Sequence, residues 1–164
     1  MKRTWIVFGV IVVAIYLVTL SYVLAPDEDS LSLPLKSLRL DETLRSELSQ
    51  KVKEAADSDR VILLYYSLVS CPPCRALEEG VFSKPAWKIF AKEQLIVRKY
   101  TFPILGEDPA RQEVVEFQLF AQLDAEGGYP LLAVLRSDGT FVSKISGYGA
   151  EGPDYYIEWI RRSL

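Results

Sequence analysis

The chain has 164 residues, of which 49% are hydrophobic and 25% charged, a composition that fits one globular domain of ordinary size. Its 19 Lys+Arg and 22 Asp+Glu give a formal net charge of -3, and without a basic cluster we expect no nucleic-acid partner. Histidine and asparagine are absent from the sequence. Their absence excludes a Ser-His-Asp or Cys-His catalytic site, a histidine-ligated metal and N-linked glycosylation.

The N-terminal residues predict a segment that crosses a membrane. Lys2 and Arg3 precede an uncharged apolar run, residues 5–25, which as a helix would reach roughly 30 Å. Residues 23–25 also resemble a processing site, so a cleaved signal peptide and a secreted protein are the alternative. The length of the run and Pro26, which fits a protease cleft poorly, favour an uncleaved anchor. Basic residues before the run and acidic ones after it place the rest of the chain in the periplasm or outside the cell, where disulfides persist.

The pattern after this segment predicts a linker and then one α/β domain. We expect residues 26–40 to form the linker, in which leucines over 31–35 could form a short edge strand, and residues 41–164 to form the domain. We expect these elements to form a mixed central sheet flanked by helices. In chain order these are a helix from 41 to about 57, a buried strand at 61–66, a helix from 72 to about 82, a helix from 85, a strand at 95–100, a helix at 108–123, a hairpin of strands at 131–135 and 141–146, and a helix at 153–164.

The two cysteines lie in Cys71-Pro72-Pro73-Cys74, at the junction between the expected buried strand and the following helix. At such a junction the helix dipole and free backbone N–H groups lower the pKa of a thiol. A second cysteine one turn later lies on the same helix face, which permits Cys71 to attack a substrate disulfide and Cys74 to resolve the mixed disulfide. Because the two prolines remove N–H donors from the Cys71 sulfur, we expect a weakly oxidising couple, as in a reductase or electron carrier.

Other uses of the cysteine pair find less support in the sequence. A structural zinc site needs four Cys or His ligands, and haem attachment needs a histidine where Arg75 stands, so we expect no metal and no cofactor. A purely structural disulfide would close a very small loop and contribute little. A non-catalytic module that binds a partner or Cu(I) through its thiolates is the alternative function. Oxidase or isomerase activity on the same site would differ from reductase activity only in redox poise.

These motifs resemble the thioredoxin superfamily, in particular its exported or membrane-anchored bacterial members. The resemblance covers residues 40–164 and rests on the strand–CPPC–helix unit, on Gly128-Tyr129-Pro130, which is similar to the family's cis-proline loop, and on the Asp138-Gly139 turn. It implies a thioredoxin fold after one N-terminal transmembrane helix. It also implies thiol–disulfide oxidoreductase activity, with Cys71 as the nucleophile and Cys74 as the resolving thiol.

The resemblance further implies how substrates bind. Pro130 would be cis, and Tyr129 would offer its backbone to a substrate peptide in β-like pairing. The partners would be cysteine-containing exported proteins and a membrane electron donor. Many family members carry a buried acid six residues before the first cysteine, where this sequence has Tyr65. The candidate proton relays for Cys74 are therefore Glu78 and Tyr65 or its neighbour Tyr66.

Overall fold

The computed structural model describes residues 30–102, 115–124 and 128–164. The elements are β1 (Ser30–Pro34), a 3-10 turn (Leu35–Ser37), α2 (Glu42–Ser58), β2 (Val61–Leu68), α3 (Pro72–Leu77), a π-helical turn (Glu78–Phe82), α4 (Pro85–Gln94), β3 (Leu95–Phe102), α5 (Val115–Leu123), β4 (Leu131–Leu135), β5 (Thr140–Ser146) and α6 (Pro153–Arg162). These confirm the expected order. The expected helix start at 108 lies outside the described residues.

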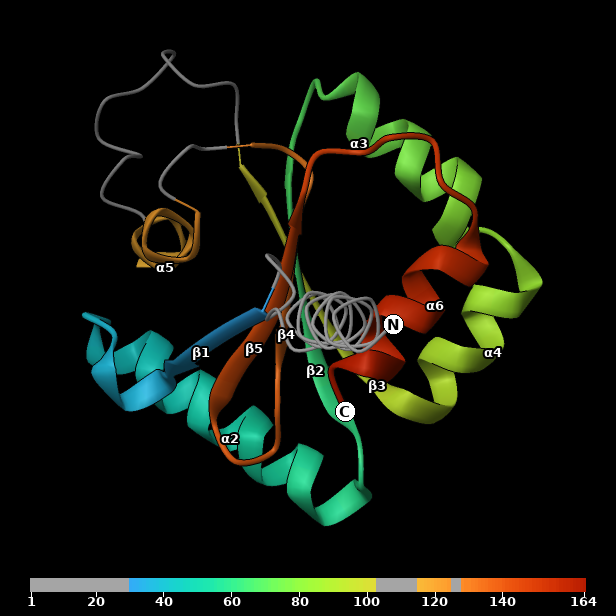
Figure 1. The fold of residues 1–164 in the computed structure, drawn as a ribbon. Coiled ribbons are helices and arrows are strands. Elements are labelled where there is room, and N and C mark those ends of the chain that lie inside the picture. The colour runs from blue at the N-terminus through green and yellow to red at the C-terminus, as the bar shows by residue number, and fades with distance from the viewer. Residues whose placement is uncertain (1–29, 103–114, 125–127) are drawn as a thin grey trace, which may run out of the picture. The chain divides into compact units, whose positions relative to one another are not determined.

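The strands form one mixed five-stranded sheet in the order β1-β5-β4-β2-β3 (Figure 1). β2 runs parallel to β3 and antiparallel to β4, with Tyr66 opposite Tyr100 on one side and opposite Leu131 on the other. The expected mixed sheet is therefore confirmed, and β2 lies between two partners. The cysteine motif follows directly at the carboxyl end of β2.

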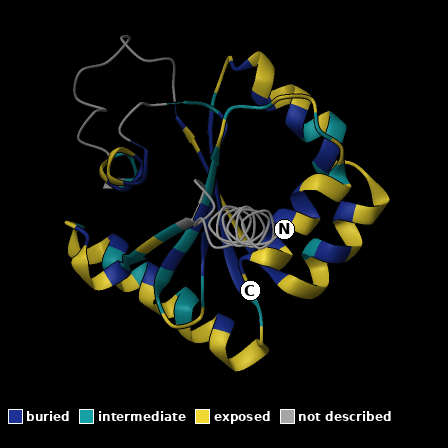
Figure 2. Cartoon of the chain, in the orientation of Figure 1, coloured by how far each residue is buried: buried dark blue, intermediate teal, exposed yellow. Residues whose placement is uncertain are grey.

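Helices cover both faces of the sheet. α2 and α5 lie on one face, and α3, α4 and α6 lie on the other (Figure 1). Leu64 and Tyr66 of β2 join the core beneath α2 and α5, whereas Leu63 and Tyr65 join the core beneath α3, α4 and α6. Successive strand residues point to opposite faces, so a strand covered on both sides must be apolar throughout, and β2 is dark blue along this run (Figure 2).

Part of the expected linker belongs to the domain. The compact unit begins at Leu31, not at residue 41. Leu35 and Leu38 are buried in the core beneath α2, and the Leu35 amide donates a hydrogen bond of 2.7 Å to the Gly139 carbonyl in the β4–β5 turn. Burial of these leucines removes apolar surface from water, which outweighs the polar, proline-containing composition that suggested a linker.

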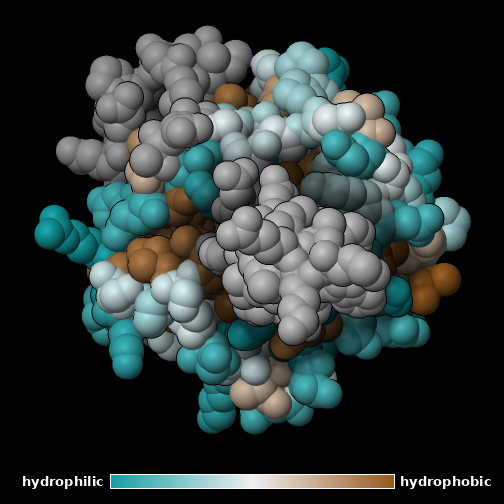
Figure 3. Space-filling model, in the orientation of Figure 1, coloured by the Kyte–Doolittle hydropathy of each residue, from teal (hydrophilic) through white to brown (hydrophobic). Residues whose placement is uncertain are grey.

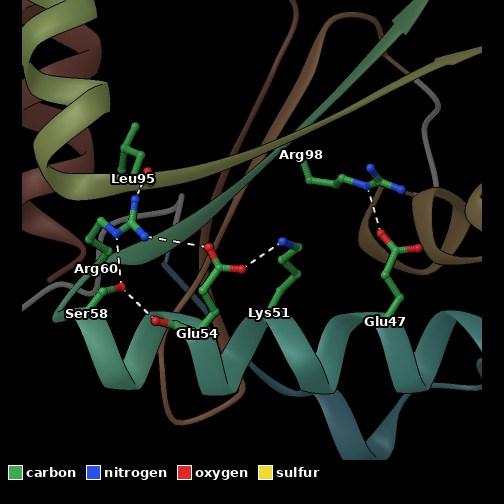
Figure 4. Close-up of polar contacts among 7 residues, drawn as sticks. All are labelled: Glu47, Lys51, Glu54, Ser58, Arg60, Leu95 and Arg98. Atoms are coloured by element: carbon green, nitrogen blue, oxygen red, sulfur yellow. Dashed lines mark hydrogen bonds and ion pairs between the residues drawn. The ribbon is translucent and has the colours of Figure 1, made fainter.

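α2 begins at a capping residue and carries ion pairs along its polar side (Figure 4). Asp41 caps its start by accepting a 2.7 Å hydrogen bond from the Thr43 amide. Near its middle, Glu47 pairs with Arg98 of β3 at 2.7 Å, which ties the helix to the edge of the sheet. The outer rim of the described part is mostly hydrophilic, with hydrophobic residues showing mainly between the helices (Figure 3).

The predicted membrane segment, residues 5–25, lies outside the described residues. Within the described ranges, no helix combines the length and the hydropathy that a membrane crossing requires.

Candidate active site: a disulfide between a strand and a helix

Cys71 and Cys74 form a disulfide at the start of α3, with their Cα atoms 5.2 Å apart. The sulfur pair is almost covered, because Cys71 is 5% exposed and Cys74 is 3% exposed. Val69, directly before the motif, is 65% exposed, and Pro72 and Pro73 between the cysteines are also exposed. The disulfide therefore lies just below an exposed apolar rim that another protein could contact.

The backbone of the motif explains why α3 begins at the first cysteine. Cys71 has extended dihedral angles and is the N-cap, and the two prolines occupy the first helical positions, where a missing N–H costs nothing. The first available amide is that of Cys74, which donates a 3.2 Å hydrogen bond to the Cys71 sulfur. The prolines thus remove two donors, as expected, and one donor still reaches the nucleophile candidate.

Two predicted relay residues meet beside the motif. The Tyr65 hydroxyl donates a hydrogen bond of 2.9 Å to Glu78 Oε1, and Lys99 Nζ donates one of 2.6 Å to the same oxygen. The Glu78 amide bonds to the Cys74 carbonyl, so the two residues keep helical i, i+4 spacing and share a face, with Cβ atoms about 5–6 Å apart. Tyr65, Glu78 and Lys99 form what we call the relay cluster.

The relay cluster fixes the charge state of its members. Burial, followed by the hydrogen bond to Glu78, raises the pKa of Tyr65 far above its usual value, so this phenol stays protonated. Partial burial alone would raise the pKa of Glu78, but the hydrogen bonds from Lys99 and Tyr65 outweigh it and the pKa lies below the usual 4.5. Glu78 is therefore a carboxylate at neutral pH.

Tyr66, the other tyrosine considered for the relay, lies on the wrong face of the sheet. Its ring stacks on Tyr100 at 5.0 Å and on Phe102 at 5.9 Å, in the core beneath α2 and α5. α3 packs on the opposite face with Tyr65. Tyr66 is therefore a core residue, and its proposed part in the relay was wrong.

The Tyr129–Pro130 peptide bond is cis, as the resemblance implies. Leu131 pairs with Tyr66 in the sheet register, so the preceding Pro130 lies at the carboxyl end of β2, the end from which the cysteine motif emerges. The Tyr129 ring stacks on Phe120 of α5 with centroids 4.6 Å apart. Burial, with a smaller contribution from Asp124, raises the pKa of Tyr129 to about 12, so its hydroxyl is neutral.

The mixed sheet, the covering helices, the cysteine pair at the end of the central strand and the cis-proline together define a thioredoxin-fold protein with a redox-type site. A family model described as thioredoxin-like matches residues 43–137. The chain belongs to this thioredoxin-like family. Family, fold and CxxC-spaced cysteines together support a thiol–disulfide oxidoreductase.

Solved structures of similar fold carry names from disulfide chemistry. The oxidoreductase DsbH is 20% identical with a TM-score of 0.55, covering 77% of this chain and 84% of its own. A disulphide isomerase from Xylella fastidiosa is 18% identical with a TM-score of 0.54, covering 76% and 97%. The oxidised C-terminal domain of DsbD from Neisseria meningitidis is 18% identical with a TM-score of 0.52, covering 77% and 99%. No curated protein matches the chain.

Lys99 is the member of the relay cluster that the sequence analysis missed. It lies directly opposite Tyr65 in the β2–β3 register, so the two side chains share a face, and its Nζ lies 5.3 Å from the centre of the Tyr65 ring. The sequence offers no local signal for this contact, because Arg98 and Lys99 are both charged and exposed and nothing in the pattern shows which of them faces Glu78.

Proposed function

We propose that the protein is a thiol–disulfide reductase or electron carrier that acts on cysteine-containing exported proteins. The observation that carries the proposal is the disulfide that joins Cys71 and Cys74 across the first turn of α3, with the Cys74 amide donating to the Cys71 sulfur. This one donor stabilises the attacking thiolate, and Pro72 and Pro73 supply no further N–H groups, which favours a weakly oxidising couple. The exposed rim of Val69, Pro72 and Pro73 leaves room for a partner.

The reaction begins with the reduced protein. The Cys71 thiolate attacks one sulfur of a substrate disulfide, forms a mixed disulfide and releases the other substrate sulfur as a thiolate. Cys74, once deprotonated, attacks the Cys71 sulfur and releases the substrate as a dithiol. Two electrons pass from the protein to the substrate, and the Cys71–Cys74 disulfide remains for a membrane electron donor to reduce.

The relay cluster supplies an acceptor for the Cys74 proton. Glu78 is one helical turn from Cys74 and is held as a carboxylate by Lys99 and Tyr65. Its side chain is 39% exposed, so the proton it accepts can pass on to water. Tyr65 positions the carboxylate and is not itself the base, because its pKa is raised.

The loop around the cis-proline supplies the substrate-binding backbone. Pro130 and the cysteine motif lie at the same end of β2, and a substrate peptide could pair with the backbone of Tyr129 in an extended conformation. Residues 5–25 would anchor the domain to the outer side of the membrane, where exported proteins and a membrane electron donor are available.

The reduction potential of the Cys71/Cys74 couple tests the direction of electron flow. It is measured on the full chain by equilibration with defined thiol–disulfide buffers, followed by alkylation and mass analysis. A reductase predicts a value near that of thioredoxin, about -270 mV. A value near that of the strong oxidant DsbA, about -120 mV, would make the protein a disulfide donor and overturn the proposed direction.

A further inference from the structure

Asp124, directly after α5, is a buried acid that the proposed reaction does not use. It is 4% exposed, although an ionised carboxylate is costly to bury without partners. Its Oδ2 accepts hydrogen bonds from the Gly128 amide at 3.0 Å and from the Ser146 hydroxyl at 2.9 Å. Its Oδ1 accepts one from Lys144 Nζ at 3.2 Å. One carboxylate therefore joins the end of α5, the start of the cis-proline loop and the end of β5.

The lack of a side chain at Gly128 lets the Ser146 hydroxyl approach its backbone closely. A Cβ atom on Gly128 would lie 2.0 Å from the Ser146 hydroxyl oxygen, closer than any side chain permits, and 3.6 Å from Asp124 Oδ2. A side chain at this position would therefore displace the Ser146 hydroxyl, whereas its distance from the carboxylate is that of an ordinary van der Waals contact. The close approach thus depends on the residue type at 128 as well as on the acid at 124.

Three separate contacts hold the cis-proline loop in place. Asp124 holds its first residue through the Gly128 amide, and Phe120, one turn earlier on α5, stacks on the Tyr129 ring at 4.6 Å and 5°. The Gly147 amide donates a 2.7 Å hydrogen bond to the Pro130 carbonyl. Only the first of these contacts is made by a charged side chain.

We propose that Asp124 is a positioning residue for substrate binding: by fixing the Gly128 amide and Ser146, it holds the backbone of Tyr129 in the orientation that pairs with a substrate peptide. This inference rests on the proposed function, because it assigns Asp124 a part in the same site. Among the described residues, the Asp124 carboxylate accepts hydrogen bonds from Gly128, Ser146 and Lys144 and not from the cysteines. Its loss therefore weakens recognition of extended protein substrates more than it weakens exchange at the sulfur atoms.

The test compares two disulfides with the reduced full-length chain. Insulin is a protein disulfide that can pair with the loop, and DTNB is a small disulfide that reports on the cysteines. For Asp124→Asn we expect the ratio of the insulin rate to the DTNB rate to fall about tenfold, as a rise in KM for insulin, which corresponds to the loss of one net hydrogen bond. Ser146→Ala removes one hydrogen bond but keeps the charge of Asp124, so it should lower the ratio by a smaller factor.

Asp57→Asn is the matched control, because Asp57 is an exposed acid in α2, near the opposite end of β2 from the cysteines. An unchanged ratio in Asp124→Asn, or an equal fall in both rates, would overturn the inference. If Asp124→Asn does not fold, an unchanged ratio in Ser146→Ala overturns it. A wild-type protein that reduces neither disulfide would overturn the proposed function and this inference with it.

Discussion

The hydrogen bond of 2.9 Å from the Tyr65 hydroxyl to Glu78 joins the residue six positions before Cys71 to the residue four positions after Cys74. Many thioredoxins place an acid at the first of these positions. Here the acid comes from the helix and the strand contributes a phenol that holds it. In the proposed mechanism Glu78 takes the part of that acid, as the acceptor of the Cys74 proton.

Replacing Glu78 by Gln should slow the release of a mixed disulfide about tenfold. General bases contribute about 10²–10⁴-fold, and we expect an effect below this range because water can partly replace a carboxylate that is 39% exposed. Rapid-quench alkylation of the Cys71 adduct measures the release step separately from the attack by Cys71. Glu79→Gln changes the adjacent exposed glutamate and should leave the release rate unchanged. Equal rates in the wild type and Glu78→Gln would remove Glu78 from the mechanism.

Gly80 and Tyr148 should show coupled stabilities. A Cβ atom on Gly80, in the π-helical turn, would lie 2.5 Å from the Tyr148 hydroxyl oxygen but 3.6 Å from the ring carbon that bears it. In Gly80→Ala alone, the clash with the Tyr148 hydroxyl opposes the gain in helix propensity, so the net change in stability is small. In a Tyr148→Phe background the clash is absent, and the same change should stabilise the protein by about 0.5–1 kcal/mol. Urea unfolding of the double-mutant cycle measures this coupling, and additive effects would contradict the contact.

Asp124 should make the stability of the protein depend on acidic pH. Burial alone would raise its pKa, but hydrogen bonds from Ser146, the Gly128 amide and Lys144 outweigh burial and hold the pKa below 3.8. Since the folded pKa is below the unfolded one, the stabilisation is complete above about pH 5 and is lost as the pH falls through the folded pKa. Asp124→Asn should cost about 1–3 kcal/mol at pH 7 and less at pH 3. Urea unfolding at both pH values measures this cost, and an equal cost at both would contradict the assignment.

The apolar side of α2, and not its ion pairs, should supply most of the stability of its contact with the sheet. Arg98 and Glu47 are 44% and 29% exposed, so Arg98→Met should cost less than about 1 kcal/mol despite the 2.7 Å distance. Leu48 is 0% exposed in the core beneath the same helix, and Leu48→Ala should cost about 2–5 kcal/mol. Thermal and urea unfolding compare the two variants. A larger loss of stability in Arg98→Met than in Leu48→Ala would contradict this prediction.

The sequence predicts those features that depend on local pattern. The continuous apolar run of β2 indicates a strand covered on both faces, Asp41 marks the start of α2, and the hairpin turn around Gly139 follows from its residue types. The cysteine motif stands out by spacing alone. For Pro130, spacing is uninformative, and the cis form was expected only from the family resemblance.

The sequence does not predict features that depend on register and packing. Lys99 reaches Glu78 because it lies opposite Tyr65 in the β2–β3 ladder, a pairing that no local pattern encodes. In the sequence, Asp124 is an ordinary polar residue at a helix end, and only the fold places Gly128 and Ser146 within hydrogen-bond distance of it. Residues 26–40 suggested a linker because they mix acidic residues, serine and proline, and no local pattern shows that the core buries Leu35 and Leu38.

The most direct test of thiol–disulfide exchange is trapping of mixed disulfides by Cys74→Ser in the full-length chain. Cys71 can still attack a substrate disulfide in this variant, but no resolving thiol follows, so covalent adducts with exported proteins should accumulate and disappear on reduction. The control variants Cys71→Ser and Cys71→Ser/Cys74→Ser should form far fewer adducts. Equal trapping by Cys74→Ser and the double variant, or no trapping at all, would contradict the account and favour a binding module.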